Sequence, residues 1–329
     1  MIRVAVDALG GDRAPEEIVA GALLAANDRI KPILYGPNGL QTGGLDHVET
    51  DGVVEMHEKP ADVVRAKPDS SLVRAVRAVG DGDADVVVSA GSTGAVLAAS
   101  LLHIRRLPGV MRPAIAVMIP ARRGPTVLLD GGANADARPE HLVQFAHMGV
   151  VFAQEMLGVA EPDVRLLSIG EEPEKGNQLT LETASLLAES GLRFMGNQEG
   201  RVLLEGEADV IVCDGFTGNV ALKTLEGAIV SVVGSLRTEV EATLRGKIGG
   251  LLIRPAARRL RQRLDPDTYG GAYLLGLKGL VVISHGSSSR RAIANAIALA
   301  ARGVEHRLVD LLAGRVPERV VESSRSSTT

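Results

Sequence analysis

Short runs of apolar residues alternate along the chain with longer stretches in which apolar residues recur every three to four positions. The short runs are typical of buried strands, and the periodic stretches are typical of helices with one apolar face. Strands are therefore predicted near residues 2–6, 32–35, 86–89, 114–118, 126–129, 164–168, 193–195, 209–213 and 279–284. Helices are predicted near residues 15–27, 70–79, 93–105, 139–157, 178–190, 217–245, 255–264, 288–302 and 304–313.

Prolines and the order of these elements support an α/β fold. Pro15, Pro139 and Pro255 stand where a proline favours the first turn of a helix. Strands that alternate with helices predict right-handed crossovers and a mainly parallel sheet. We expect one two-lobed domain over residues 1–315, followed by a flexible polar tail over residues 316–329.

Five of the predicted strand-to-helix turns are rich in glycine, serine and aspartate. They lie within residues 4–18, 86–99, 128–141 and 210–223, and at the segment that begins with His285. A helix that opens with small and hydroxyl residues offers free N–H groups to a phosphate or an oxyanion. For any single turn, the needs of the turn itself are the alternative explanation. Together the five turns predict one cleft for a phosphorylated or acylated small molecule.

Residues 222–275 depart from the alternation, because their pattern is helical and no strand is predicted among them. Gly249–Gly250 permits a turn, so we expect a helical hairpin with an apolar tip and arginines beside it. Such a hairpin can form a dimer, dock on an acidic partner or lie on an anionic membrane, and a helix packed in the core is the alternative. Its membrane- or partner-binding residues would be Ile248, Leu251, Leu252, Ile253, Arg254, Arg258 and Arg261.

The composition narrows the class of protein. Of the 329 residues, 45% are hydrophobic but only 2% are aromatic, and the formal net charge is −4, which argues against a general nucleic-acid partner. The single cysteine, Cys213, excludes a disulfide framework, and a buried strand thiol is favoured over a catalytic nucleophile. Neither a signal peptide nor a stretch suited to cross a bilayer is recognised, so a cytoplasmic protein is expected.

Seven motifs follow one another along the chain: GGDRAP at 10–15, SAGSTGA at 89–95, DGGAN at 130–134, EEPEKGN at 171–177, GNQEGR at 196–201, DGFTGNV at 214–220 and HGSSSRRAI at 285–293. Their order resembles that of bacterial phosphate acyltransferases of the PlsX type, over residues 2–313. Each motif alone is weak evidence, whereas the ordered set is specific. Arg13, Ser92 and Ser289–Arg290 stand where the family commonly has other residues.

The resemblance implies both a fold and a reaction. The fold would be a three-layer α/β/α sandwich like that of isocitrate and isopropylmalate dehydrogenases, with a mainly parallel sheet, a cleft and a protruding helical hairpin. The reaction would convert long-chain acyl-acyl-carrier-protein and inorganic phosphate reversibly into acyl phosphate, the first step towards phosphatidic acid. Phosphate is itself a nucleophile, so the site must place it, stabilise an oxyanion and support the departing thiolate.

Three residues are the candidates for this chemistry. Lys175 would place a positive charge beside the phosphate, and Asn219 would donate an amide hydrogen bond to the carbonyl oxygen. His285 would donate to phosphate or carry a proton. The alternatives are a solvated lysine, a helix cap and a histidine that closes a strand end. Phosphate or substrate would be bound by Asp7, Gly10, Gly11, Asp12, Ser92, Thr93, Gly94, Asn134, Asn177, Gly286, Ser287 and Ser288.

No metal or cofactor is expected, because Asp7, Asp12, Asp130 and Asp214 are spread through turns and resemble caps and braces. The implied partners are the acyl carrier protein, phosphate, a second copy of the chain, an anionic membrane surface and the membrane glycerol-3-phosphate acyltransferase that uses acyl phosphate. The hairpin arginines would receive either lipid or carrier.

Other functions are compatible with parts of the sequence. The alternatives are a phosphotransacylase that uses acyl-CoA and a non-catalytic membrane scaffold. A nicotinamide dehydrogenase is disfavoured, because ALGGDRAP after the first strand lacks the G-x-G-x-x-G spacing.

Overall fold

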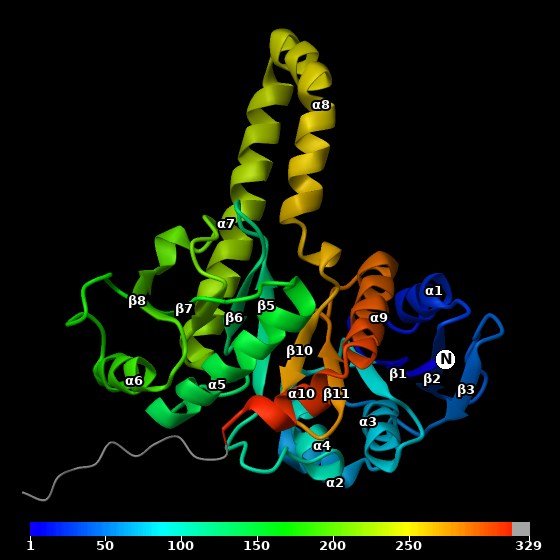
Figure 1. The fold of residues 1–329 in the computed structure, drawn as a ribbon. Coiled ribbons are helices and arrows are strands. Elements are labelled where there is room, and N and C mark those ends of the chain that lie inside the picture. Colours follow the sequence, from blue (N-terminus) through cyan, green and yellow to red (C-terminus); the bar gives the residue numbers. More distant parts are fainter. Residues whose placement is uncertain (318–329) are drawn as a thin grey trace, which may run out of the picture.

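A computed structural model describes residues 1–317, which fold around a sheet of eleven strands. The strands lie in the order β3-β2-β1-β4-β11-β10-β5-β6-β9-β7-β8, and helices cover both faces (Figure 1). Their bounds are β1 Ile2–Asp7, β2 Ile30–Gly36, β3 Asp46–Glu49, β4 Val86–Ser89, β5 Ala114–Ile119, β6 Thr126–Leu129, β7 Val164–Ser168, β8 Phe194–Glu199, β9 Val210–Val212, β10 Ala272–Leu275 and β11 Leu280–Ile283.

The helices form the two outer layers. Their bounds are α1 Glu16–Ala25, α2 Pro60–Ala66, α3 Ser71–Asp81, α4 Thr93–His103, α5 Pro139–Phe152, α6 Gln178–Glu189, α7 Gly215–Ala242, α8 Leu244–Leu264, α9 Arg290–Glu305 and α10 Leu308–Arg315. Side chains of a strand alternate between faces: Val4 and Val6 pack with α1, α5, α9 and α10, whereas Ala5 packs with α3 and α4. The helix α7 covers the same face as α4, over β9 and β6. The predicted α/β/α sandwich is confirmed.

The sheet consists of two parallel groups that run in opposite directions. β3, β2, β1, β4 and β11 are parallel to one another, as are β6, β9, β7 and β8. Between them β11, β10, β5 and β6 pair antiparallel in succession. The mainly parallel sheet is confirmed, but the carboxyl ends of the two groups lie at opposite edges of it.

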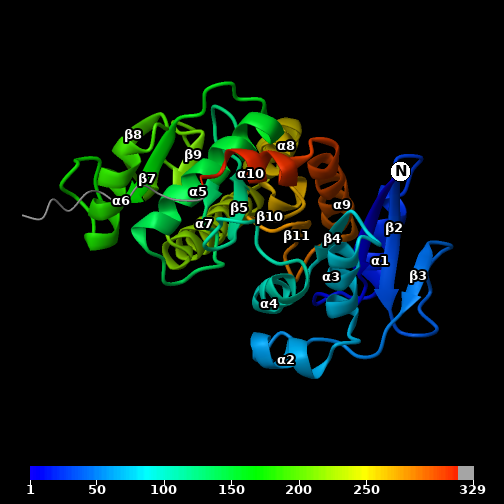
Figure 2. The same cartoon turned by 60° about the horizontal axis from the view of Figure 1, so that its bottom comes forward.

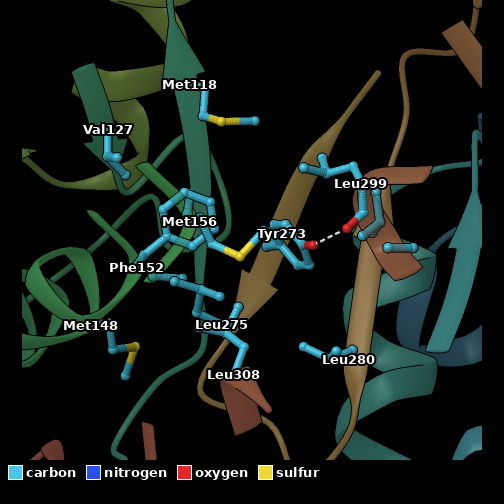
Figure 3. Close-up of a cluster of buried hydrophobic side chains, with 14 of the residues drawn as sticks. Met118, Val127, Met148, Phe152, Met156, Tyr273, Leu275, Leu280, Leu299 and Leu308 are labelled. Atoms are coloured by element: carbon cyan, nitrogen blue, oxygen red, sulfur yellow. Dashed lines mark hydrogen bonds between the residues drawn. The ribbon is translucent and has the colours of Figure 1, made fainter. Parts of the chain in front are cut away.

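The core where the two groups meet is centred on Tyr273 of β10 (Figure 3). Its ring packs edge-on against Phe152 of α5, with the centroids 5.4 Å apart. Its hydroxyl donates to the carbonyl oxygen of Leu299 in α9, and burial raises the pKa of Tyr273. One side chain thus joins β10 to helices from distant parts of the chain.

The helices α7 and α8 form a hairpin that protrudes from the sandwich (Figure 1). The hairpin was predicted, but its turn was misplaced: Thr243 connects the helices and caps α8, while Gly249–Gly250 and Pro255 lie inside α8. The helix α7 is long and apolar enough to cross a membrane by length and composition alone, whereas the sequence was expected to contain no such stretch, and the apolar 18-residue window of α7 is 0% buried. The single chain therefore leaves this apolar surface uncovered.

Three short elements were not predicted. β3 has only four residues of mixed polarity, and α2 is a seven-residue helix. β10 lies inside residues 222–275, which were expected to contain no strand, because its four residues come only a few residues after a long helical pattern. Residues 318–329, most of the predicted flexible tail, lie outside the described part of the chain.

Candidate functional site

The loops after β1, β4 and β11 form a first loop cluster, defined as residues 8–15, 90–92 and 284–289. The hydroxyls of Ser71 and Ser89 donate hydrogen bonds to the buried carboxylate of Asp7 at 2.6 and 2.7 Å, and burial raises the pKa of Asp7. The Asp12 N–H donates to the carbonyl oxygen of Gly286 at 2.8 Å. Asp7 therefore braces this cluster from below.

Glycines let these loops approach one another closely. A Cβ atom on Gly10 would lie 2.4 Å from the Asp7 carboxylate and 2.9 Å from the Gly91 nitrogen. Gly11 has a φ of +109° and faces the Gly286 carbonyl oxygen. Gly10 and Gly11, which were predicted to bind phosphate or substrate, are thus needed for the packing of the first loop cluster.

The amino terminus of α9 is partly satisfied by the protein itself. Ser289 caps the helix by accepting from the Ala292 N–H, and its own hydroxyl donates to Asp267 at 2.7 Å. The Arg290 N–H donates to Glu17 at 2.6 Å, and the ion pair with the Arg290 side chain lowers the pKa of Glu17 to about 2. An anion at this helix end would therefore meet the carboxylates of Asp267 and Glu17.

The HGSSS turn is also held by internal bonds. His285 is exposed, and its Nδ1 accepts from the Ser287 N–H at 3.2 Å, which leaves the proton of a neutral ring on Nε2. Ser288 is buried against Ser284, with 2.9 Å between their hydroxyl oxygens. At the same edge Ser92, Thr93 and Gly94 open α4, and the Ser92 side chain makes no capping bond.

The loops after β6, β7 and β9 form a second loop cluster at the opposite edge, defined as residues 130–138, 169–177 and 213–219. Buried Asp130 accepts from the N–H groups of Ile115, Gly132, Ala133 and Asn134 at 2.7–3.0 Å. α7 packs on this loop so closely that a Cβ atom on Gly218 would lie 2.0 Å from the Asp130 carbonyl oxygen. Asp130 therefore acts as a brace, as Asp7 does at the first cluster.

Lys175 and Asn219 both belong to this second cluster. Asp214 caps α7 by accepting from the Thr217 N–H, whereas Asn219 is the fifth residue of the helix and exposed. A Cβ atom built on Gly132 would lie 3.5 Å from Asn219 Nδ2, so the amide lies beside the DGGAN loop. Lys175 is exposed after β7, the strand next to β9.

The loop of Lys175 is held through its backbone. Its carbonyl oxygen accepts from Ser168 at 3.3 Å and from Asn197 at 3.4 Å. The Asn177 side chain caps α6 by accepting from the Thr180 N–H at 2.9 Å. Thus Asn177 orders the loop while the Lys175 ammonium group remains exposed.

A pocket of about 560 Å³ lies between α4 and the DGGAN loop. We call it the inner pocket, and it is lined by Leu97, Leu101, Arg106, Met111, Arg112, Pro113, Ala133 and Asn134. Arg112 is exposed and forms no ion pair with any residue in the described chain. Burial, then Arg112 and Arg138, lower the pKa of nearby His141. The pocket therefore combines positive charge with an apolar wall, as an anion with an acyl chain requires.

A family model described as "Fatty acid synthesis protein" matches residues 2–310. The phosphate acyltransferase of Heliobacterium modesticaldum is 45% identical over 97% of this chain and 99% of its own length. The chain belongs to the phosphate acyltransferase family. A second phosphate acyltransferase, from Desulfitobacterium hafniense strain Y51, is 47% identical over 96% of this chain and 98% of its own.

Solved structures support the fold of this phosphate acyltransferase family member. A branched-chain phosphotransacylase from Enterococcus faecalis V583 has a TM-score of 0.61 at 18% identity, covering 93% of this chain and 100% of its own. The EutD phosphotransacetylase from Staphylococcus aureus has a TM-score of 0.58 at 16% identity, covering 92% and 94%. At these identities the likeness concerns the architecture.

The structure brings Lys175, Asn219 and Asn134 to one edge of the sheet and places His285 at the other. The prediction that all five turns meet in one cleft is therefore wrong. The antiparallel pairs in the middle of the sheet reverse the second group of strands, so the turns of the two groups lie at opposite edges. The turned view shows α4 and α7 on the same side of the central strands, with α9 and α10 on the other side (Figure 2).

Sequence reasoning missed Arg106 and Arg112. Both residues precede β5, whereas the residues predicted from the sequence were chosen in turns that follow strands. Since β5 is antiparallel to β6, the beginning of β5 lies beside the end of β6. The signal was the segment HIRRLPGVMRP, which holds three arginines and no acidic residue. Among the described residues, no group of three or more histidine, cysteine, aspartate or glutamate side chains could hold a metal ion.

Proposed function

We propose that this enzyme transfers a long-chain acyl group from acyl-acyl-carrier-protein to inorganic phosphate at the inner pocket. Membership of the family supports acyl transfer to phosphate in fatty acid and phospholipid synthesis. The observation that carries the location is the inner pocket itself, in which Arg106 and Arg112 face an apolar wall beside Asn134.

In the proposed step an oxygen of hydrogen phosphate attacks the thioester carbonyl carbon. The new C–O bond forms, the C–S bond breaks, and the thiolate leaves with the prosthetic arm of the carrier. The thiolate takes up the proton that hydrogen phosphate loses, so the step balances and is reversible. The protein has to orient the dianion and stabilise the tetrahedral oxyanion.

The side chains divide this work between them. Arg112 and Lys175 hold the phosphate oxygens, and Asn219 donates its amide to the oxyanion. The sequence also predicted His285 as a proton carrier and phosphate contacts in the first loop cluster, but neither takes part in the step that we propose at the inner pocket. That cluster lies at the opposite edge, where carboxylates surround the start of α9.

The decisive experiment incubates purified protein with phosphate and either palmitoyl-acyl-carrier-protein or palmitoyl-CoA. Acyl phosphate, trapped as its hydroxamate, and free thiol are measured together. Faster phosphate-dependent release from the carrier supports the proposal, and faster release from the CoA ester favours the acyl-CoA phosphotransacylase. If neither donor yields acyl phosphate, the protein is a scaffold rather than this enzyme.

We also propose that the hairpin pairs two copies of the chain and rests on an anionic membrane. Apolar side chains are exposed along both helices, among them Val230 at 73%, Leu244 at 75% and Leu252 at 76%. So much apolar surface on one chain marks an interaction site. Arg254 and Arg258 lie exposed on α8, and Arg261 follows on the same helix. A cytoplasmic enzyme attached in this way can pass acyl phosphate to a membrane glycerol-3-phosphate acyltransferase.

A further inference from the structure

A second depression of about 450 Å³ adjoins the inner pocket, and we call it the outer depression. It is lined by Leu101, Arg105, Arg106, Leu107, Pro108, Gly109, Val110 and Lys278. The two hollows share Leu101 and Arg106. A long, thin ligand can therefore lie across that boundary, with one end in the inner pocket and the other at the surface.

The charges of the outer depression come from two chain segments fastened to each other. Arg105 follows α4, and Lys278 lies in the turn between β10 and β11. The Lys278 N–H donates to the Arg105 carbonyl oxygen at 2.9 Å, and the Leu107 N–H donates to Gly276 at 3.0 Å. These bonds hold the two exposed cations on one rim, so the positive charge is a fixed feature of the surface.

The backbone at Arg105 has a conformation that is unfavourable for arginine. Its φ of +69° lies in the left-handed region, which glycine and asparagine adopt at lower cost. Neither Arg105 nor Lys278 forms an ion pair with any residue between 1 and 317. A cation in a strained position without an ion-pair partner in the protein indicates that an external anion binds there.

We propose that the outer depression, through Arg105 and Lys278, is the docking surface for an acidic acyl carrier protein. This inference rests on the proposed function, which requires a thioester on a long prosthetic arm. The phosphodiester at the base of that arm meets the two cations, and the arm runs past Leu101 so that the thioester reaches Asn134 and Arg112. The acidic surface of the carrier is complementary to the rim.

The hairpin arginines are less suited to receive the carrier. α7 begins in the second loop cluster and has 28 residues, so it is roughly 42 Å long. Arg254 lies ten residues after the start of α8, about 15 Å back from the turn, which leaves roughly 27 Å to the start of α7. A carrier on the hairpin would have to deliver its thioester over that distance, whereas the outer depression adjoins the inner pocket at Leu101 and Arg106.

The test compares two donors with the variant Arg105→Glu/Lys278→Glu. With palmitoyl-acyl-carrier-protein at low salt, kcat/KM should fall at least about tenfold, mostly through KM, and the difference from wild type should shrink as salt rises. With palmitoyl-pantetheine, which lacks both the carrier and the phosphodiester, kcat/KM should stay within about twofold of wild type. The neutral variant Arg105→Asn/Lys278→Gln suits the left-handed backbone and should show a smaller loss of the same kind.

Matched controls separate this loss from a general effect of charge or folding. Arg29→Glu/Arg193→Glu makes the same charge change at two exposed arginines outside both pockets and should keep wild-type kcat/KM with the carrier. Equal losses with both donors, or no loss with either, would overturn the proposal. The proposal would also be overturned if kcat/KM with the carrier fell in Arg254→Glu/Arg258→Glu but not in Arg105→Glu/Lys278→Glu. If wild type makes no acyl phosphate from either donor, the proposed function fails instead.

Discussion

At the scale of single residues, the second loop cluster separates side chains that hold the loops from side chains that are free to meet a substrate. Asp130 accepts four backbone N–H groups, and Asp214 caps α7. Their carboxylates are occupied by the fold. Lys175, Asn219 and Arg112 are exposed at the same edge, so their substitution should change the chemistry more than the stability.

Lys175→Ala should lose two to three decades of acyl phosphate formation, because a charged donor to the transition state contributes about 2–4 kcal/mol. Asn219→Ala should lose a similar amount with an unchanged Tm, since Asp214 is the cap of α7. Lys31→Ala, which removes a surface ion pair with Asp46, is the control and should keep its rate. Near-normal turnover of Lys175→Ala would remove this residue from the mechanism.

The thiol of Cys213 should be inert in the native protein. It is 3% exposed, and burial, with Asp214 and Asp130 nearby, raises its pKa well above the usual range. An unfolded thiol ionises near pH 8.5, so the folded state resists deprotonation and loses stability as the pH rises past that value. Iodoacetamide at pH 8.5 should therefore leave activity intact and label the protein only in denaturant. Rapid inactivation of native protein would show that the thiol is accessible.

At the scale of elements, the contact between β10 and α9 depends on the absence of a side chain at Gly303. A Cβ atom there would lie 2.6 Å from the Tyr273 hydroxyl oxygen. Gly303→Ala should therefore lower stability by about 1–3 kcal/mol, as overpacking does in a dense core. Gly227→Ala in α7 has nothing within 4 Å and should raise stability by up to about 1 kcal/mol. Equal changes in the unfolding free energy of the two variants would contradict this account.

The hairpin should bind anionic vesicles reversibly and in a salt-sensitive way. Aliphatic insertion contributes several kcal/mol, and each arginine near the surface contributes about 1 kcal/mol. Leu251→Glu/Leu252→Glu should lower vesicle binding at least tenfold in a flotation assay, while turnover with soluble substrates stays nearly intact. Unchanged flotation of this double variant would show that these residues do not touch the membrane.

Elements with a clear apolar pattern were predictable, including four-residue strands, whereas elements of mixed polarity or next to a long helix were not. The apolar strand β11 and the amphipathic α9 appear near their predicted positions, because burial on one or both faces leaves a clear pattern. β10 is as short as β11 but escaped notice because its four residues come soon after the long helical pattern of α8 and were included in it. The turn of the hairpin was misplaced because glycine pairs and proline suggested a break, whereas tertiary structure keeps all three inside α8.

At the scale of the whole molecule, the direction of the strands decides which loops share a site. Both loop clusters are rich in glycine, but the antiparallel pairs among β11, β10, β5 and β6 place them at opposite edges. Sequence alone located Lys175, Asn134 and Asn219 at strand ends. It could not show that Arg112, which precedes a strand, reaches the same edge, because the direction of β5 depends on long-range pairing.

The most direct test of the account is the initial rate of acyl phosphate formation as a function of phosphate for wild type, Arg112→Ala and His285→Ala. Loss of a phosphate-binding cation at the inner pocket should lower kcat/KM for phosphate at least about a hundredfold in Arg112→Ala, whereas His285→Ala should stay within about tenfold of wild type. The reverse order, with both variants folded, would move the chemistry to the first loop cluster and contradict the account.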